Sequence, residues 1–212
     1  MDRREFSTRL AAGGLFAAAG AARAQAPVEG THFVRLSQRV PVQLPADKKI
    51  EVVEFFWYEC PHCNTFEPVL EAWVRRLPPD VAFRRVPVGF SARHQVAQKL
   101  YYALEEMGQL DALHRRVFQA VHGQGVRLTS EADATTLVGA LGGDKARFAE
   151  LFKSFAVATK ATKARQLTDG YKIDGVPALG IHGRFYTSGA LAGGHERAVS
   201  VADFLIAQSR KA

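Results

Sequence analysis

The residues best suited to chemistry are Cys60-Pro61-His62-Cys63, and this stretch holds the only two cysteines of the 212-residue chain. Two thiols separated by two residues can exchange a disulfide with a substrate or contribute to a metal site. If a helix begins at Pro61, a residue suited to the first helical position, Cys60 lies at its N-terminus. There the unpaired backbone N–H groups and the helix dipole favour a thiolate over a thiol. The stretch therefore indicates redox or metal chemistry.

Three elements would position the cysteine pair. A nearly continuous apolar run predicts a strand over residues 49–58 that is buried on both faces of a sheet. Residues 61–77 have the apolar spacing of a helix, with a kink expected at Pro68, and residues 81–88 predict the next strand. The cysteines would then lie at the carboxyl end of a strand, where sites in α/β sheets cluster.

Glu54 interrupts the apolar run that precedes the cysteines. Because a charged carboxylate is costly to bury, this side chain either reaches a wet edge of the sheet or handles a proton. Glu59 comes directly before Cys60, and a negative charge near the sulfur would disfavour the thiolate. A side chain at the end of a strand can equally point into solvent, and we expect this of Glu59.

Residues 91–169 predict helices throughout. Ser130 and Asp133 have the spacing of a capping box, and Asp144 would begin a fourth helix. The apolar stripes of these helices are most simply core, and they contain no cofactor-binding motif. The expected apolar face of the fourth helix consists of Phe148, Leu151, Phe152 and Phe155.

The remaining segments predict an α/β unit around this helical block. Residues 32–36 could form a short edge strand, and strands on either side of His182-Gly183 would form a hairpin. A helix over residues 197–208 would close the chain. Without the helical block, about 100 residues remain, which is the usual size of one domain.

The first 26 residues have the features of an export signal. Three arginines precede an apolar stretch that is shorter than the ~20 residues of a membrane-spanning helix, and a small-x-small cleavage site follows it. Residues 3–6 partly match a twin-arginine motif, with an ordinary basic region as the alternative. Either route would place the cysteines outside the reducing cytoplasm, where they would be oxidised or redox-active.

The charge of the chain points to no nucleic-acid partner. The formal net charge is +7, and removing residues 1–26 takes away four arginines and two acids, which leaves +5. No long block of lysine and arginine is present in the sequence.

The cysteine stretch, together with Gly175-Val176-Pro177-Ala178 before a hairpin, resembles the DsbA family of periplasmic thiol:disulfide oxidases. The Pro-His pair is specific, since thioredoxins usually carry Gly-Pro between their cysteines and periplasmic isomerases Gly-Tyr. The resemblance implies a thioredoxin fold with an inserted all-helical domain. Residues 27–90 and 170–212 would form the thioredoxin-like domain, and residues 91–169 the insertion.

The resemblance also assigns roles to individual residues. It implies a cis peptide bond between Val176 and Pro177 beside the cysteines, with the backbone of Val176 pairing with an extended substrate segment. Glu54 matches the buried acid of the family, which would transfer a proton to or from Cys63. His62, either cationic or hydrogen-bonding, would favour the Cys60 thiolate.

The activity implied by the resemblance is the introduction of disulfide bonds into exported proteins in the periplasm. The expected partners are reduced protein substrates and a membrane reoxidant of the DsbB type. The expected protein is a monomer without a cofactor. The enzyme alternative is a disulfide isomerase or reductase. The binding-protein alternative is a zinc site formed by Cys60, Cys63 and a histidine, although no other histidine has metal-ligand spacing with a cysteine.

Overall fold

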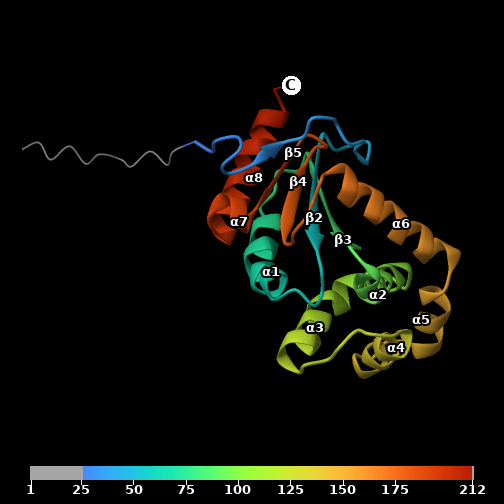
Figure 1. Ribbon diagram of the computed structural model, residues 1–212. Coiled ribbons are helices and arrows are strands. Elements are labelled where there is room, and N and C mark those ends of the chain that lie inside the picture. Colours follow the sequence, from blue (N-terminus) through green and yellow to red (C-terminus); the bar gives the residue numbers. More distant parts are fainter. Residues whose placement is uncertain (1–25, 212) are drawn as a thin grey trace, which may run out of the picture.

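The computed structural model describes residues 26–211 (Figure 1). The expected export signal lies outside the described residues except for Ala26. Among residues 26–211, no helix has the length and apolar character needed to cross a membrane. The elements are β1 (Val34–Arg35), β2 (Ile50–Phe56), α1 (Pro61–Val74), β3 (Val81–Pro87), the 3-10 turn η1 (Ala92–His94), α2 (Gln95–Glu106), α3 (Leu110–Gly123), α4 (Glu131–Ala140), α5 (Lys145–Phe152), α6 (Phe155–Gly170), β4 (Ala178–Ile181), β5 (Phe185–Ser188), α7 (Gly189–Ala192) and α8 (His195–Ser209).

The strands form one mixed sheet in the order β1-β5-β4-β2-β3. Strand β2 pairs in parallel with β3 and antiparallel with β4, so it has a neighbour on each side. All of its residues are buried, which confirms the strand expected from the apolar run. The short β1 pairs with β5 at the edge of the sheet, where the sequence predicted it.

The hairpin between β4 and β5 also follows the prediction. His182 and Gly183 both have positive φ, 50° and 63°, and the Arg184 N–H donates to the Ile181 carbonyl at 3.0 Å. Two positive φ values in a two-residue loop define a type I′ turn, whose twist matches that of the flanking strands. A Cβ at Gly183 would collide with the carbonyl of Val40, so this position requires glycine.

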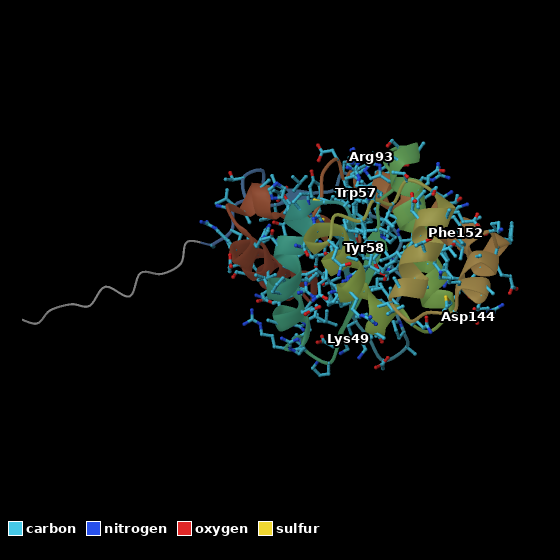
Figure 2. The ribbon with its side chains drawn as sticks, turned by 90° about the horizontal axis from the view of Figure 1, so that it is seen from below. Lys49, Trp57, Tyr58, Arg93, Asp144 and Phe152 are labelled. Carbon is cyan, nitrogen blue, oxygen red and sulfur yellow. The ribbon has the colours of Figure 1, made fainter. Side chains whose placement is uncertain are left out.

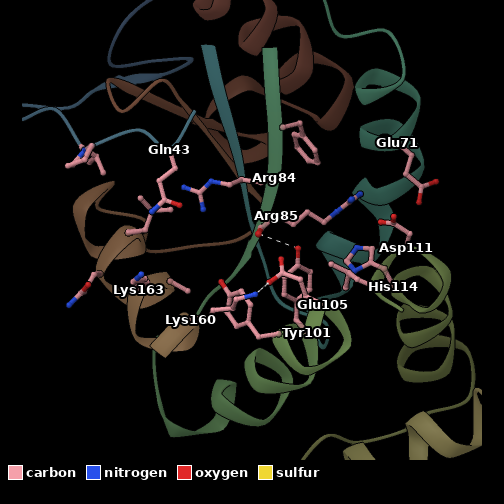
Figure 3. Close-up of a pocket in the computed structure, with 18 of the residues that line it drawn as sticks. Gln43, Glu71, Arg84, Arg85, Tyr101, Glu105, Asp111, His114, Lys160 and Lys163 are labelled. Atoms are coloured by element: carbon pink, nitrogen blue, oxygen red, sulfur yellow. Dashed lines mark hydrogen bonds and ion pairs between the residues drawn. The ribbon is translucent and has the colours of Figure 1, made fainter. Parts of the chain in front are cut away.

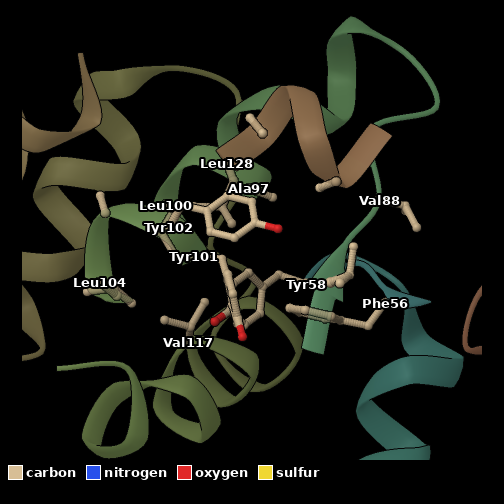
Figure 4. Packing of buried hydrophobic residues seen from close by; sticks show 14 of the residues in the cluster. Phe56, Tyr58, Val88, Ala97, Leu100, Tyr101, Tyr102, Leu104, Val117 and Leu128 are labelled. Atoms are coloured by element: carbon tan, nitrogen blue, oxygen red, sulfur yellow. The ribbon is translucent and has the colours of Figure 1, made fainter. Parts of the chain in front are cut away.

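Helices cover both faces of the sheet and bury two apolar cores. Helices α1 and α8 lie on one face, and α2 and α6 contact the sheet from the other (Figure 1). The core on the side of α2 joins the end of β2 to α2 and α3 through aromatic and aliphatic side chains (Figure 4). Burying each of these side chains contributes roughly 1.5–3 kcal/mol to folding. Labelled members of this core are Phe56, Tyr58, Leu100, Tyr101 and Val117.

The helical block between β3 and β4 contains α2 to α6, as the sequence predicted. The Ser130 side chain and the Asp133 side chain form the expected capping box of α4, and Asp144 caps α5. The assignment of Phe155 to the apolar face of the fourth helix is wrong. Ser154 caps a new helix there, and Phe155, its first residue, is 87% exposed. The short helix α7 was not predicted.

Candidate active site

Cys60 is the N-cap residue of α1, and Pro61 occupies the first turn, which confirms the predicted helix start. The Cys60 N–H donates to the carbonyl of Trp57 at 3.0 Å, and this turn links the end of β2 to the helix. Both cysteines are free thiols, so the structure represents the reduced pair.

The two thiols differ in access and in acidity. Cys60 is 8% exposed and Cys63 is fully buried, so only Cys60 can be reached from solvent. The thiol of Cys63 and the backbone N–H groups of Cys63 and His62 stabilise the Cys60 thiolate, which lowers its pKa to about 6 although burial opposes the change. The pKa of Cys63 is raised well above the ordinary value. Burial is the largest cause, and the nearby Cys60 sulfur adds to it.

We therefore expect a single thiolate transition near pH 6 in the reduced protein. Above this pH Cys60 is ionised, and below it the thiolate is lost while Cys63 remains a thiol throughout. The ultraviolet absorbance of the thiolate, followed against pH, measures this transition. The Cys60→Ser variant is the control and should show no transition in this range. A midpoint near the ordinary pKa of 9.0 would contradict the assignment.

The predicted Val176-Pro177 bond is cis and lies beside the cysteines. The Cys60 thiol donates to the Val176 carbonyl at 3.5 Å, although the two residues are 116 positions apart in the chain. Pro61 and His62 are exposed at the helix start, and Pro177 is buried. A pocket of about 500 Å³ adjoins this loop, with His62, Val176, Pro177, Leu191 and His195 among its lining residues.

Glu54 lies on β2 and is fully buried, so it does not reach a wet edge of the sheet. Its Oε2 is 3.0 Å from Nε of Arg85, which faces it across the β2–β3 register. Burial, followed by repulsion from Glu67, raises the pKa of Glu54 to about 8, and Arg85 opposes this change. The Glu54 charge in turn contributes to the raised pKa of Cys63. At neutral pH Glu54 therefore carries a proton close to the buried thiol.

The prediction that Glu59 points into solvent is wrong. Its side chain is only 7% exposed and pairs with Arg127 across 3.5 Å. Arg127 belongs to the segment after α3, so this ion pair joins the residue before Cys60 to the helical block. Glu59 is also absent from the main influences on the pKa of Cys60, which are Cys63, burial and His62.

Two residues between β2 and the cysteines contact side chains from the segment that follows β3. Trp57 packs on His94 with ring centroids 4.5 Å apart, and the Arg93 guanidinium lies 4.9 Å from the Trp57 ring (Figure 2). Tyr58 is fully buried, and its carbonyl accepts a hydrogen bond from His122 Nε2 at 2.8 Å.

The sequence did not identify a buried polar network under the cysteines. Its members are Glu67 of α1, Arg85 of β3, His114 of α3 and the Tyr58 hydroxyl. One signal was present: Glu67 lies four positions after Cys63, on the face of α1 that also carries Phe66 and Leu70. An acid on an apolar face was a candidate for a buried role, in the same way as Glu54.

Comparisons with known proteins agree with this geometry. Residues 51–197 match the family model of the DSBA-like thioredoxin domain. The chain is 39% identical to a thiol:disulfide interchange protein DsbA of Azotobacter vinelandii over 206 residues, which are 96% of this chain and 95% of that protein. It is 39% identical over 212 residues to the DsbA of Bordetella parapertussis, covering both proteins completely.

A solved structure shows the same fold. The crystal structure of Pseudomonas aeruginosa DsbA has a TM-score of 0.82 and 37% sequence identity, and the match covers 87% of this chain and 95% of that chain. Among residues 26–211, no group of three or more His, Cys, Asp or Glu side chains could hold a metal ion. The chain has the thioredoxin fold with an inserted helical block, and it belongs to the DsbA family.

Proposed function

We propose that this protein introduces disulfide bonds into other proteins by exchange through a Cys60–Cys63 disulfide. The observation that carries the proposal is the asymmetry of the pair. Cys60 is accessible and acidic at a helix start, whereas Cys63 is buried and holds its proton. A stable Cys60 thiolate is a good leaving group and stabilises the reduced form, and both properties favour an oxidase.

The Cys60–Cys63 disulfide is the oxidant of the substrate dithiol, and the reaction needs no other oxidant. A substrate thiolate attacks Cys60 Sγ, the Cys60–Cys63 bond breaks, and Cys63 leaves as a thiolate. Protonated Glu54 supplies the proton that converts the buried Cys63 thiolate into a thiol. A second substrate thiolate then attacks the substrate sulfur of the mixed disulfide and releases Cys60 as a thiolate. The substrate loses two electrons and the cysteine pair gains them.

The loop with the cis proline is the proposed docking site. The Val176 carbonyl lies within reach of Cys60 Sγ, so a substrate strand that pairs with the backbone of Val176 would bring its sulfur to the reactive cysteine. The apolar side of the neighbouring 500 Å³ pocket, near Leu191 and Pro177, would take side chains of that strand. Pro61 and His62 border the same opening on the helix side.

The finer biological setting is proposed from the family. The relatives are DsbA proteins, and the N-terminal sequence has the features of an export signal, so we place this protein in the periplasm. Its substrates would be reduced exported proteins, and a membrane reoxidant of the DsbB type would restore the disulfide. We propose that the protein acts as a monomer, with residues 27–90 and 170–212 as the redox domain and 91–169 as the insertion.

Oxidation of a peptide that carries two cysteines tests the proposed function. One equivalent of oxidised protein should convert one equivalent of peptide to its disulfide form, with rapid loss of the Cys60–Cys63 bond. A protein that instead rearranges wrong disulfides in a scrambled substrate, without oxidising this peptide, would be an isomerase. That result would reject the oxidase proposal.

Replacing Glu54 with glutamine should slow this oxidation without greatly changing the redox equilibrium. Glutamine fills the same buried space but cannot give a proton to Cys63, so release of Cys63 should slow by up to about 10²-fold. The redox potential should change by less than about 30 mV, the equivalent of one pKa unit. Stopped-flow rates and equilibrium with glutathione measure the two quantities.

Glu59→Gln is the matched control for this variant, because Glu59 is also poorly exposed and close to Cys60 but pairs with Arg127 away from Cys63. Its rate should remain within about twofold of the parent. An equal loss of rate in both variants would show that Glu54 has no special role in the proton transfer.

A further inference from the structure

The buried network beneath the cysteines contains two carboxylates that share one guanidinium. Arg85 Nη2 donates to Glu67 Oε2 at 3.0 Å, while its Nε approaches Glu54 Oε2 at the same distance. The two contacts differ in alignment. Arg85 forms a hydrogen bond with Glu67, whereas both oxygens of Glu54 and the Arg85 Nε lack a hydrogen-bond partner. The guanidinium therefore stabilises the charge of Glu67 more than that of Glu54.

Glu67 receives a second donor from the helical block. His114 on α3 is 5% exposed, and its Nε2 lies 3.3 Å from Glu67 Oε1. The other ring nitrogen, Nδ1, lies 2.8 Å from the hydroxyl of Tyr58. If the Tyr58 hydroxyl donates to Nδ1, a neutral imidazole must carry its proton on Nε2, where it can donate to Glu67. With this arrangement of protons, the Tyr58 hydroxyl stabilises the His114 tautomer that donates to an ionised Glu67.

The pKa shifts of the three groups agree with this geometry. Burial lowers the pKa of His114, so the ring is neutral at pH 7 and acts on Glu67 as a hydrogen-bond donor. Burial alone would raise the pKa of Glu67, but the donors His114 and Arg85 outweigh it and hold this pKa below the ordinary value. Glu54 has Arg85 but no second donor comparable to His114, and the negative Glu67 adds to the cost of ionising it.

We infer that His114 and Tyr58 are positioning residues that hold Glu67 ionised and thereby keep the one exchangeable proton of the carboxyl pair on Glu54, beside Cys63. The inference rests on the proposed function only for the use of that proton by Cys63. It gives the helical insertion a direct part in the redox site, because His114 belongs to α3. Figure 3 shows Arg85 reaching from β3 toward α1, with His114 near it at the wall of a cavity of about 830 Å³.

Other charged and titratable groups also face Glu54 and must be considered in any test. They are Glu67 and Glu71 of α1, Arg85 of β3, Tyr101 of α2, Tyr58 after β2 and the redox cysteine Cys63. Replacing His114 changes none of these residues themselves, and the hydrogen bonds that it removes are those to Glu67 and to the Tyr58 hydroxyl. A change in the titration of Glu54 in such a variant therefore reports the hydrogen bonds of His114 to Glu67 and Tyr58.

The test is a pH titration of the reduced protein labelled with ¹³C at glutamate carboxyl carbons, with Glu54→Gln used to assign the Glu54 signal. The parent midpoint should lie at about 8. In His114→Phe, Glu67 loses one of its two donors, and its ionised form becomes less stable. Glu67 should then compete with Glu54 for the proton, so the Glu54 midpoint should fall by about one pH unit or more. His114→Gln retains an N–H donor and should restore most of the parent value.

His122→Phe is the matched control, because His122 lies on the same helix but hydrogen-bonds the backbone carbonyl of Tyr58 instead of Glu67. Its Glu54 midpoint should stay at the parent value. If His114→Phe does not fold, Tyr58→Phe, which removes only the hydroxyl, should shift the midpoint in the same direction. An unchanged midpoint in the folded variant, or an equal shift in His122→Phe, would overturn the inference. Because the titration requires no disulfide exchange, its result is independent of whether the protein proves to be an oxidase.

Discussion

Replacing Cys60 with serine should abolish the oxidation of dithiol substrates, with a loss of at least about 10³-fold in rate, because a serine hydroxyl forms no disulfide. Cys63 cannot take over the reaction. Its sulfur has no exposure to solvent, and its raised pKa keeps it a thiol, which is a poor nucleophile. Stoichiometric oxidation of the two-cysteine peptide measures the loss.

Alkylation of the reduced protein distinguishes the reactivity of the two cysteine thiols. Cys63→Ser retains the accessible thiolate and should react rapidly with iodoacetamide at pH 7, whereas Cys60→Ser should react very slowly. Similar alkylation rates in the two variants would contradict the assigned asymmetry, and so would substantial peptide oxidation by Cys60→Ser. Both variants remove one small side chain from the same helix start, so each serves as the structural control of the other.

Replacing His62 with serine should make the cysteine pair less oxidising. The imidazole is exposed at the helix start, and its charge is one of the influences that lower the pKa of Cys60. The stronger influences, from the Cys63 thiol and from backbone N–H groups, remain in the variant. We therefore expect the pKa of Cys60 to rise by about one unit and to stay below its ordinary value.

This rise in the pKa of Cys60 should change the redox potential of the cysteine pair by a measurable amount. At a pH where Cys60 is mostly a thiolate in both proteins, one pKa unit corresponds to about 1.4 kcal/mol and to a potential about 30 mV more reducing. His195→Ser is the control, since His195 borders the pocket beside the cis proline but does not act on the pKa of Cys60. An unchanged potential in His62→Ser would remove this residue from the mechanism.

The strands and helices could be predicted because their sequence patterns are local. The apolar run of β2, the Ser130 capping box and the His182-Gly183 turn each determine structure within a few residues. Phe155 shows where this reasoning fails. The apolar spacing continues from α5 into the next helix. Ser154, however, caps a new helix that runs in another direction, and the Phe155 ring therefore lies in solvent.

The residues of the candidate site were predictable for a different reason. Cys60, His62 and Cys63 are adjacent in the chain, and the resemblance to a known family connected them with Val176 and Pro177. The network of Glu67, Arg85 and His114 joins three elements that only the fold brings together. Glu59 was misjudged for the same reason, because Arg127 reaches it from the distant segment after α3.

The redox potential of the purified protein, measured by equilibration with glutathione, tests the oxidase proposal most directly. The Cys60 thiolate, with a pKa of about 6, stabilises the reduced form by about 30 mV at pH 7, and family membership places the pair among oxidants. We predict a potential less negative than about −200 mV, above the range of glutaredoxins. A potential as reducing as that of thioredoxin, about −270 mV, would contradict the proposal.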